Sequence, residues 1–154
     1  MKTWHLIFNN SEEMTKKQFS SFQAAHKQML AEVARTKGIF SKEAVLDDKE
    51  ATLSAGGDVM HWMILETNDT SPYAVVEVCG DDSDVCYSDN MHAAHSYLNE
   101  CYGVAKENLG TCDTDEDSRR ESFCIDNNAT VFHYGSGPAQ MWTVISQHTD
   151  SVTA

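Results

Sequence analysis

Two strand-like segments of the chain are apolar on both faces, and this feature constrains the fold more than any other. Residues 58–66 read DVMHWMILE, residues 73–79 read YAVVEVC, and the turn-rich sequence NDTSP lies between them. Short apolar runs bounded by turn residues predict buried strands. We therefore expect a β-hairpin whose two strands, being apolar on both faces, occupy the middle of a sheet.

Two longer segments have the periodicity of amphipathic helices. The first extends over about residues 11–37, and Asn10 or Ser11 is available as its N-cap. The second extends over about residues 90–109. Between the first helix and the apolar strands, residues 39–57 are ambiguous. One interpretation is a short helix that is capped by Ser41 and ends at Gly56-Gly57.

The remaining strand-like segments lie towards the two ends of the chain. Residues 3–8, TWHLIF, alternate in polarity and predict a first strand. The polar residues 80–90 predict a loop before the second helix. Near the C-terminus, strand character recurs in residues 119–125, 129–134 and 141–147.

The order of these elements indicates one domain of the α+β class. We expect a mixed or antiparallel sheet of about five to six strands with the two main helices on one face, and a βαββαβ core with added C-terminal strands would make it ferredoxin-like. A chain of 154 residues has the length of a single domain. We place that domain at residues 1–148, followed by a frayed polar tail at residues 149–154. We find no internal repeat in the sequence.

Charge is distributed unevenly along the chain. Residues 1–46 contain seven lysines and arginines against four acidic residues, a net charge of +3. The remainder contains four against twenty, a net charge of −16, and the total is −13. Charge of this kind governs solubility, electrostatic steering and the choice of partner. It disfavours nucleic acid as a partner and favours a basic one.

Seven acidic residues in two loops are the candidate contacts for such a partner: Asp81, Asp82, Asp84, Asp113, Asp115, Glu116 and Asp117. If the two loops meet in space they form an acidic patch, which predicts a non-enzymatic interaction protein that binds a basic protein in a salt-dependent manner. Immunity proteins that neutralise cationic nucleases, and bacterial or phage inhibitors that imitate the charge of DNA, use the same physics, and the analogy rests on charge alone. If the loops lie apart, the acidity serves only solubility.

Four ionisable residues in otherwise apolar strands indicate an alternative function. His5, His61, Glu77 and His133 would share one sheet face if their strands were neighbours in suitable register, with Trp62 as an aromatic contact. Three imidazoles and a carboxylate suit a zinc or iron site, or an acid–base pair that works near neutral pH. The alternative is therefore a small-molecule- or metal-binding protein or enzyme. A one-residue change of register would separate the group, and each histidine would then be hydrogen-bonded or partly exposed at a strand end.

A second candidate metal site lies at the start of the second helix. Asp89, His92 and His95 are three residues apart, so one helical turn could present all three to a metal ion. The HExxH pattern of helical zinc sites is absent. The competing interpretation packs His95 at the edge of the apolar stripe and leaves His92 in solvent.

Other chemistry is not indicated by the sequence. It contains no GxGxxG, GxxxxGK[ST] or GxSxG motif, so it favours a protein that is not an enzyme and needs no cofactor. Its five cysteines form no CxxC pair, and its N-terminus does not resemble a secretory signal, so we expect reduced thiols in the cytoplasm. No apolar run is long enough to cross a membrane. The lysine-bearing outer face of the first helix could pack against an acidic region of a second copy, which would give a homodimer.

Overall fold

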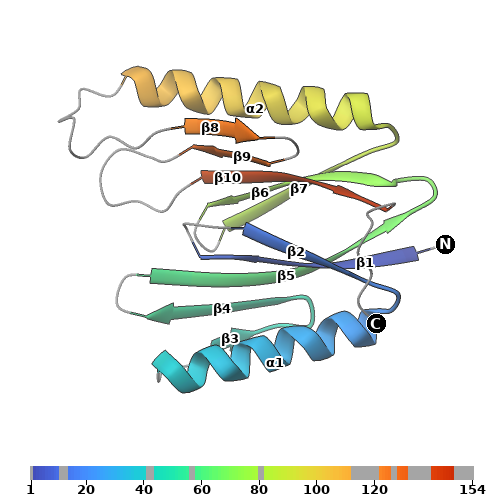
Figure 1. The fold of residues 1–154 in the computed structure, drawn as a ribbon, viewed down its shortest axis with the longest axis vertical. Helices are drawn as coiled ribbons and strands as arrows, with labels where there is room; N and C mark the ends of the chain where they lie inside the picture. The colour runs from blue at the N-terminus through green and yellow to red at the C-terminus, as the bar shows by residue number, and fades with distance from the viewer. Residues whose placement is uncertain are drawn as a thin grey trace.

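The computed structural model of the chain has four layers (Figure 1). Two five-stranded antiparallel sheets pack face to face, and one helix covers the outer surface of each sheet. The two helices therefore lie at opposite ends of the longest axis of the molecule. The structure describes residues 2–10, 14–40, 44–55, 58–79, 82–111, 122–125, 128–131 and 140–147.

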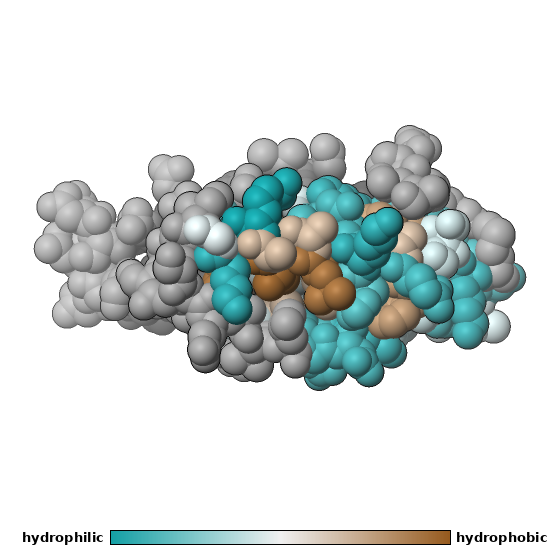
Figure 2. Space-filling view, turned by 90° about the horizontal axis from the view of Figure 1, so that it is seen from below, coloured by the Kyte–Doolittle hydropathy of each residue, from teal (hydrophilic) through white to brown (hydrophobic). Residues whose placement is uncertain are grey.

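The N-terminal half of the chain forms the first sheet and its helix. The strands are β1 (Lys2–Asn9), β2 (Met14–Phe19), β3 (Ala44–Leu46), β4 (Glu50–Ala55) and β5 (Asp58–Asn68). They lie in the order β2-β1-β5-β4-β3, and α1 (Phe22–Phe40) packs on the outer surface. Figure 2, drawn from the α1 side, shows hydrophilic side chains around a central hydrophobic group.

The C-terminal half forms the second sheet and its helix. The strands are β6 (Tyr73–Cys79), β7 (Asp82–Ser88), β8 (Ser122–Ile125), β9 (Asn128–Val131) and β10 (Gln140–Ser146). They lie in the order β7-β6-β10-β9-β8, and α2 (Met91–Thr111) packs on the outer surface of this sheet.

The two halves repeat the same ββαβββ unit. Strands β1 to β5 correspond to β6 to β10, and α1 corresponds to α2, because both the order along the chain and the order in the sheet are the same. The interpretation that the sequence has no internal repeat is therefore wrong at the level of the fold. The side chains of the two units have diverged, whereas their topology has not.

The N-caps of the two helices show how the residues of the two units align. At the start of α1 the Ala24 amide donates to Ser21 Oγ at 3.1 Å, and at the start of α2 the Ala93 amide donates to Asn90 Oδ1 at 2.7 Å. The shift from Ser21 to Asn90 is 69 residues, and it also superimposes the cross-strand pairs of β1 and β2 on those of β6 and β7. Under this shift the sequence Ala-Ala-His is identical at residues 24–26 and 93–95.

One tryptophan marks the repeat in the later strands. Trp62 on β5 pairs with Phe8 on β1, and Trp142 on β10 pairs with Glu77 on β6. Phe8 and Glu77 are themselves equivalent under the shift of 69 residues. The two tryptophans therefore occupy the same place in the two units.

The core has three layers, because each sheet is buried on both faces. The layer between α1 and the first sheet includes Leu6 and Met29, and the layer between α2 and the second sheet includes Val75 and Leu98. The middle layer, between the sheets, contains Ile7, Met63, Leu65, Ala74, Val76, Val78 and Ile145.

The two apolar segments of the sequence are β5 and β6, and they do not form a hairpin with each other. β5 pairs with β1 and β4, whereas β6 pairs with β7 and β10 in the other sheet. Alternate residues of β5 show the reason, since Trp62 and Ile64 face α1 whereas Met63 and Leu65 face the second sheet. Both faces of these strands are apolar because a helix covers one face and another sheet covers the other.

Residues 14–19 form strand β2, so the prediction of a helix there is wrong. In the sequence MTKKQF, Lys16 and Gln18 turn towards the second sheet, while Phe19 packs under α1. Pairing with β1 satisfies the backbone groups on one side of this edge strand. The helix begins only after Ser21, which caps it.

Two other segments are also strands where the sequence predicts something else. Residues 41–55 contain β3 and β4 instead of a short helix, and residues 80–90 contain β7 instead of only a loop. β3 and β7 lie at sheet edges, and β7, which reads DSDVCYS, is polar as edge strands often are because one side faces solvent. Pairing with a neighbour decides their conformation, and their own apolar pattern does not.

The prediction of the α+β class is confirmed. The predicted single sheet with both helices on one face is replaced by two sheets with a helix on each outer face, because the inner faces are apolar and cover each other. A ferredoxin-like topology is not confirmed. The tail at residues 149–154 lies outside the described residues. Within the described ranges, neither helix is long and apolar enough to cross a membrane.

Polar contacts from β2 join the two sheets. Lys16 Nζ donates to the Val144 carbonyl at 2.9 Å and to Thr143 Oγ1 at 3.3 Å. Gln18 Nε2 donates to the Gln147 carbonyl at 3.1 Å. These contacts satisfy polar groups at the border of the apolar middle layer.

His5 is the most deeply buried titratable group near these contacts. Its side chain is 2% exposed, and its Nε2 lies 2.8 Å from Thr67 Oγ1. Burial, together with the charge of Lys16, lowers the pKa of His5 to about 4. The imidazole is therefore neutral in the folded protein at neutral pH.

We predict that His5 makes stability depend on pH between about 4 and 6.5. The unfolded chain protonates this imidazole below its ordinary pKa of 6.5, whereas the folded protein does so only near pH 4. The contribution is therefore complete above pH 6.5 and is lost as the pH falls, by about 3 kcal/mol over the window. Urea unfolding of the parent and of His5→Gln measures it, because the variant lacks the titrating group.

The free energy of unfolding of the parent, relative to that of His5→Gln, should fall as the pH is lowered. His92→Gln, at an exposed position on α2, is the control and should track the parent at every pH. A difference between parent and His5→Gln that stays constant with pH would contradict the prediction.

Candidate functional site

A cleft opens beside α2, where the helix crosses β6 and β10. Its volume is about 280 Å³. That is near the lower limit for small-molecule pockets, so the cleft suits a single side chain or a small ligand. It is lined by Glu77, Tyr97, Glu100, Cys101, Val104, Ala105, Gln140 and Trp142.

Glu77 forms the polar floor of the cleft. Its neighbours Val76 and Val78 face the first sheet, so alternation along β6 turns Glu77 towards α2. The carboxylate accepts hydrogen bonds from Trp142 Nε1 at 2.8 Å and from Gln140 Nε2 at 3.1 Å. These donors on β10 fix its orientation and leave lone pairs on both oxygens for a ligand.

One edge of α2 forms the facing wall. Tyr97, Cys101 and Val104 follow each other at steps of four and three residues, so they lie along the same side of the helix. The Tyr97 hydroxyl is hydrogen-bonded to the Cys101 thiol, and this bond, with the electrostatic effect of the same thiol, raises the pKa of Tyr97 to about 12. Val104 is 55% exposed and adds an apolar contact to the rim.

The Cys101 thiol is protonated at neutral pH. Burial raises the pKa of this thiol, the hydrogen bond with Tyr97 lowers it, and the charges of Glu77 and Glu100 raise it further, with a net increase. The thiolate, not the thiol, is the nucleophile and metal ligand. The cleft therefore does not activate this cysteine.

Acidic groups dominate the surroundings of the cleft. Asp84 on β7 lies opposite Glu77, and a second cavity of about 100 Å³ borders both residues. Between Lys49 and Lys106 the chain contains no lysine or arginine. Up to residue 68 the chain has eight basic and nine acidic residues, a net charge of −1, whereas the rest has three and fifteen, a net charge of −12. The cleft lies in this acidic half.

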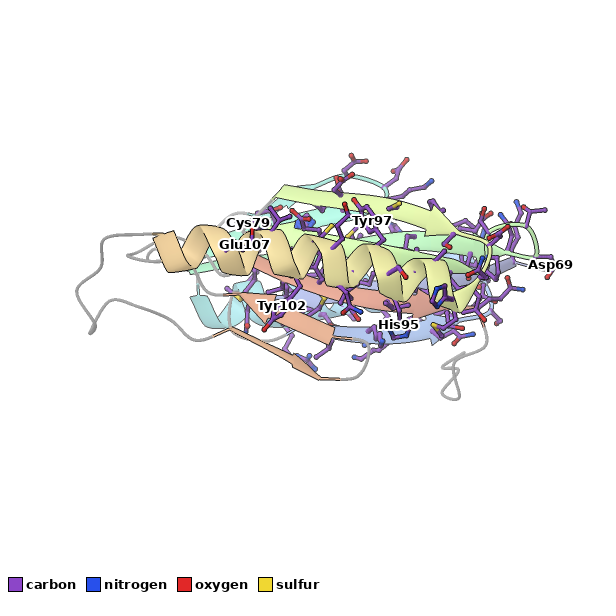
Figure 3. All side chains as sticks on the ribbon, turned by 90° about the horizontal axis from the view of Figure 1, so that it is seen from above. Asp69, Cys79, His95, Tyr97, Tyr102 and Glu107 are labelled. Carbon is purple, nitrogen blue, oxygen red and sulfur yellow. The ribbon has the colours of Figure 1, made fainter. Side chains whose placement is uncertain are left out.

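Figure 3 shows which edge of α2 carries the cleft. Tyr97 projects from the edge along which β7 runs, and Cys79 lies on the same side. Tyr102 and His95 lie along the opposite edge of the helix. The cleft is therefore on the β7 side, near the edge of the sheet and open to solvent.

The N-terminal half is closed at the equivalent place. Under the shift of 69 residues, Glu77 corresponds to Phe8 and Cys101 corresponds to Glu32. The rings of Phe8 and Trp62 pack with centroids 5.0 Å apart, and Glu32 Oε1 accepts a hydrogen bond from Trp62 Nε1 at 3.3 Å. In both halves the tryptophan donates to a glutamate. In the N-terminal half, however, a phenyl ring and a longer helix side chain fill the space.

Two of the seven acidic residues predicted to contact a partner are described by the structure. Asp84 is exposed beside the cleft, and Asp82 lies opposite Cys79 at the start of the same strand. The contact of the two acidic loops stays a prediction, because the remaining residues lie outside the described ones: Asp81, Asp113, Asp115, Glu116 and Asp117.

The residues of the alternative site are spread over different layers. His5 and His61 share the inner face of the first sheet, but they are four residues apart in register, which is about 13 Å along a strand. Glu77 faces α2 on the far side of the second sheet, and Trp62 faces α1. His133 lies outside the described residues.

His61 has its own polar neighbours between the sheets. Its Nδ1 lies 3.3 Å from Thr52 Oγ1, and its Nε2 lies 3.7 Å from Glu50 Oε1. Glu50 Oε1 also accepts a hydrogen bond from Ser83 Oγ at 3.3 Å, which links β4 to β7. The group therefore connects the two sheets.

The candidate metal residues at the start of α2 do not form a coordination site. Asp89 and His92 are exposed, and His95 is half-buried at the position equivalent to His26, which stacks on Phe22 at 5.5 Å. Among the described residues, no three potential ligands of this kind come together. The equivalence of His95 to His26 supports the interpretation in which it packs at the edge of the apolar stripe.

The neighbours of Glu77 in the cleft were not predicted from the sequence to lie beside it, among them Tyr97, Glu100, Gln140 and Trp142. The first two belong to a predicted helix, but their place beside Glu77 depends on where α2 crosses the sheet. The other two reach Glu77 because β10 pairs with β6, although the two strands are more than 60 residues apart.

Comparison of the chain with protein-family models, with curated proteins and with solved structures found no match.

We predict that Trp142 and Glu77 are energetically coupled. Trp142→Phe removes the indole donor, and it should lower the free energy of unfolding by about 2 kcal/mol, since a hydrogen bond to a charged group contributes about 1.5–3 kcal/mol. Glu77→Gln removes the charge and keeps one acceptor oxygen. In the double variant the loss should be smaller than the sum of the single losses by at least about 0.5 kcal/mol.

Urea unfolding at neutral pH of the four proteins measures this coupling. The matched control combines Trp142→Phe with Asp48→Asn, an exposed residue of the N-terminal half, and these two losses should be additive. Additivity of Trp142→Phe and Glu77→Gln would show that the hydrogen bond does not hold the floor of the cleft.

Proposed function

We propose that this chain is a non-enzymatic interaction protein whose acidic C-terminal half binds a basic partner. The observation that carries the proposal is the cleft beside α2, where Glu77 forms the floor and Glu100 lies on the wall. A cationic side chain of the partner would enter this cleft. The partner itself would face the acidic surface of β7 and α2.

The charge of the C-terminal half supports a basic partner. A net charge of −12 on this half attracts cations over a distance and speeds their association, and the effect weakens as salt screens it. Within the N-terminal half, by contrast, Glu32 already has Lys17 at 3.0 Å. Of the two carboxylates that accept a hydrogen bond from a tryptophan, Glu77 is therefore the one left for an external cation to neutralise.

The construction of the cleft supports binding rather than catalysis. Glu77 is held by two hydrogen bonds, so no side-chain ordering is needed when a ligand arrives. Val104 and the Trp142 ring offer apolar contacts for the aliphatic stem of a lysine or arginine. The raised pKa of Cys101 opposes nucleophilic chemistry in the same cleft.

We predict salt-dependent binding of basic peptides through the cleft. The probe is a fluorescent ten-residue peptide of mixed lysine and arginine, titrated with the protein at low and at physiological ionic strength. Binding should be strongest at low salt. The variant Glu77→Gln/Glu100→Gln should weaken it at least about tenfold, because close charge pairs at interfaces contribute about 1.5 kcal/mol or more.

The matched control removes two charges from the other half, in the variant Asp48→Asn/Glu66→Gln. It should change the dissociation constant by less than about threefold, since net charge alone acts weakly at a distance in salt. If the two variants weaken binding equally, the peptide binds a diffuse acidic surface and the cleft is not a specific site. No binding of the peptide to the parent at low salt would leave solubility as the role of the acidity.

A further inference from the structure

The N-terminal half holds a lysine at the place where the C-terminal half has its cleft. Lys17 on β2 points to α1, and its Nζ lies 3.0 Å from Glu32 Oε2. Glu32 also accepts hydrogen bonds from Gln28 Nε2 at 2.8 Å and from Trp62 Nε1 at 3.3 Å. Four residues therefore form one closed network around a carboxylate.

This network neutralises the charge of Glu32 with a lysine from the same unit. Burial acts to raise the pKa of Glu32, but its hydrogen bonds and the nearby ammonium outweigh burial and hold that pKa below its ordinary value. The lysine comes from an edge strand, and its side chain stays 43% exposed while it reaches the carboxylate. A buried carboxylate beside a tryptophan is thus paired with a cation in this unit.

The C-terminal half has residues at the equivalent positions of this network, but a cysteine stands in place of the lysine. Under the shift of 69 residues, Lys17, Gln28 and Glu32 correspond to Cys86, Tyr97 and Cys101. Trp62 corresponds to Trp142 through their pairing with the equivalent residues Phe8 and Glu77. The equivalent residues lie together there too, since Cys86 acts electrostatically on both Tyr97 and Cys101.

In the N-terminal unit the carboxylate belongs to a helix residue, whereas in the C-terminal unit it belongs to a strand residue. Glu77 stands at the place of Phe8 and accepts the indole hydrogen bond that Glu32 accepts in the other unit. The second unit therefore keeps the tryptophan and a glutamate, replaces the lysine by Cys86, and has a cleft of about 280 Å³.

We propose that this cleft binds the primary ammonium group of a lysine side chain supplied by the partner, in the place that Lys17 occupies in the N-terminal half. The inference rests on the proposed function and names the group that the partner presents. An ammonium is a compact charge with three donors, which suits the free lone pairs of Glu77 and the carboxylate of Glu100. The stem of the lysine would lie along Val104 and Trp142.

The test introduces a lysine into the C-terminal half at residue 86, the position equivalent to Lys17. In Cys86→Lys the new side chain starts from the edge strand β7, as Lys17 does from β2, and should occupy the cleft from within. A lysine-only peptide is titrated by fluorescence anisotropy at low salt, together with its Nε-acetylated form, which should not bind. Cys86→Lys should weaken binding of the lysine peptide at least about tenfold.

The control is Ser96→Lys, which adds the same charge to an exposed position of α2 where the N-terminal half also has a lysine, Lys27. It should weaken binding by less than about threefold, because an exposed charge acts through a screened field. A second variant, Glu77→Phe/Cys86→Lys/Cys101→Glu, transfers the phenylalanine, lysine and glutamate of the closed arrangement and changes the net charge by the same amount. It should lose binding as Cys86→Lys does, and circular dichroism checks that each variant is folded.

The outcomes separate this inference from the proposed function. If the parent binds the mixed peptide in a salt-dependent way, but Cys86→Lys and Ser96→Lys bind the lysine peptide equally, the ammonium site is overturned and the acidic binding surface stands. If the transferred arrangement binds as tightly as the parent, the ammonium site is likewise overturned. If neither peptide binds the parent, both proposals fall.

Discussion

The face-to-face packing of the two sheets is the interaction on which the rest of the structure depends. Val76 and Ile145 are completely buried in the layer between them, and the strands that supply this layer must also be apolar on their outer faces, where a helix covers them. The two helices are thereby placed on opposite outer surfaces. The cleft lies along the side of α2 that faces β7, so it opens to solvent and not into the core.

The two units have the same topology but different side chains around their equivalent tryptophans. Trp62 and Trp142 keep one structural position and each donates to a glutamate, but Glu32 comes from a helix and Glu77 from a strand. In the first unit Phe8 fills the space in front of the tryptophan. In the second unit that space is an open cleft lined by acidic residues. The uneven charge of the sequence therefore appears in the structure as an acidic cleft in one unit and a filled space at the equivalent position of the other.

Local pattern predicted the elements that carry a complete signal of their own. α2 has an apolar stripe and an N-cap at Asn90, and the buried strands β5 and β6 have largely apolar runs. β2 has neither, since MTKKQF becomes a strand only by pairing with β1 and packing Phe19 under α1. The prediction of a hairpin is wrong for a related reason. The apolar residues of a strand face show that the face is buried, but not whether a helix or a sheet covers it. The repeat is not evident in the sequence because few residues beyond Ala-Ala-His are identical between the two units.

The sequence by itself determined the secondary-structure class, the burial of β5 and β6, and the concentration of negative charge in the second half, because periodicity and charge are properties of neighbouring residues. Only the tertiary structure decided which sheet each strand joins and which acidic residue lies in a cleft. Asp84 was predicted from its loop, whereas the cleft floor is formed by Glu77, which was predicted for another site. Its role depends on the pairing of β6 with β10 and on the crossing of α2 above them. Such contacts join residues that are far apart in the chain, so no local pattern encodes them.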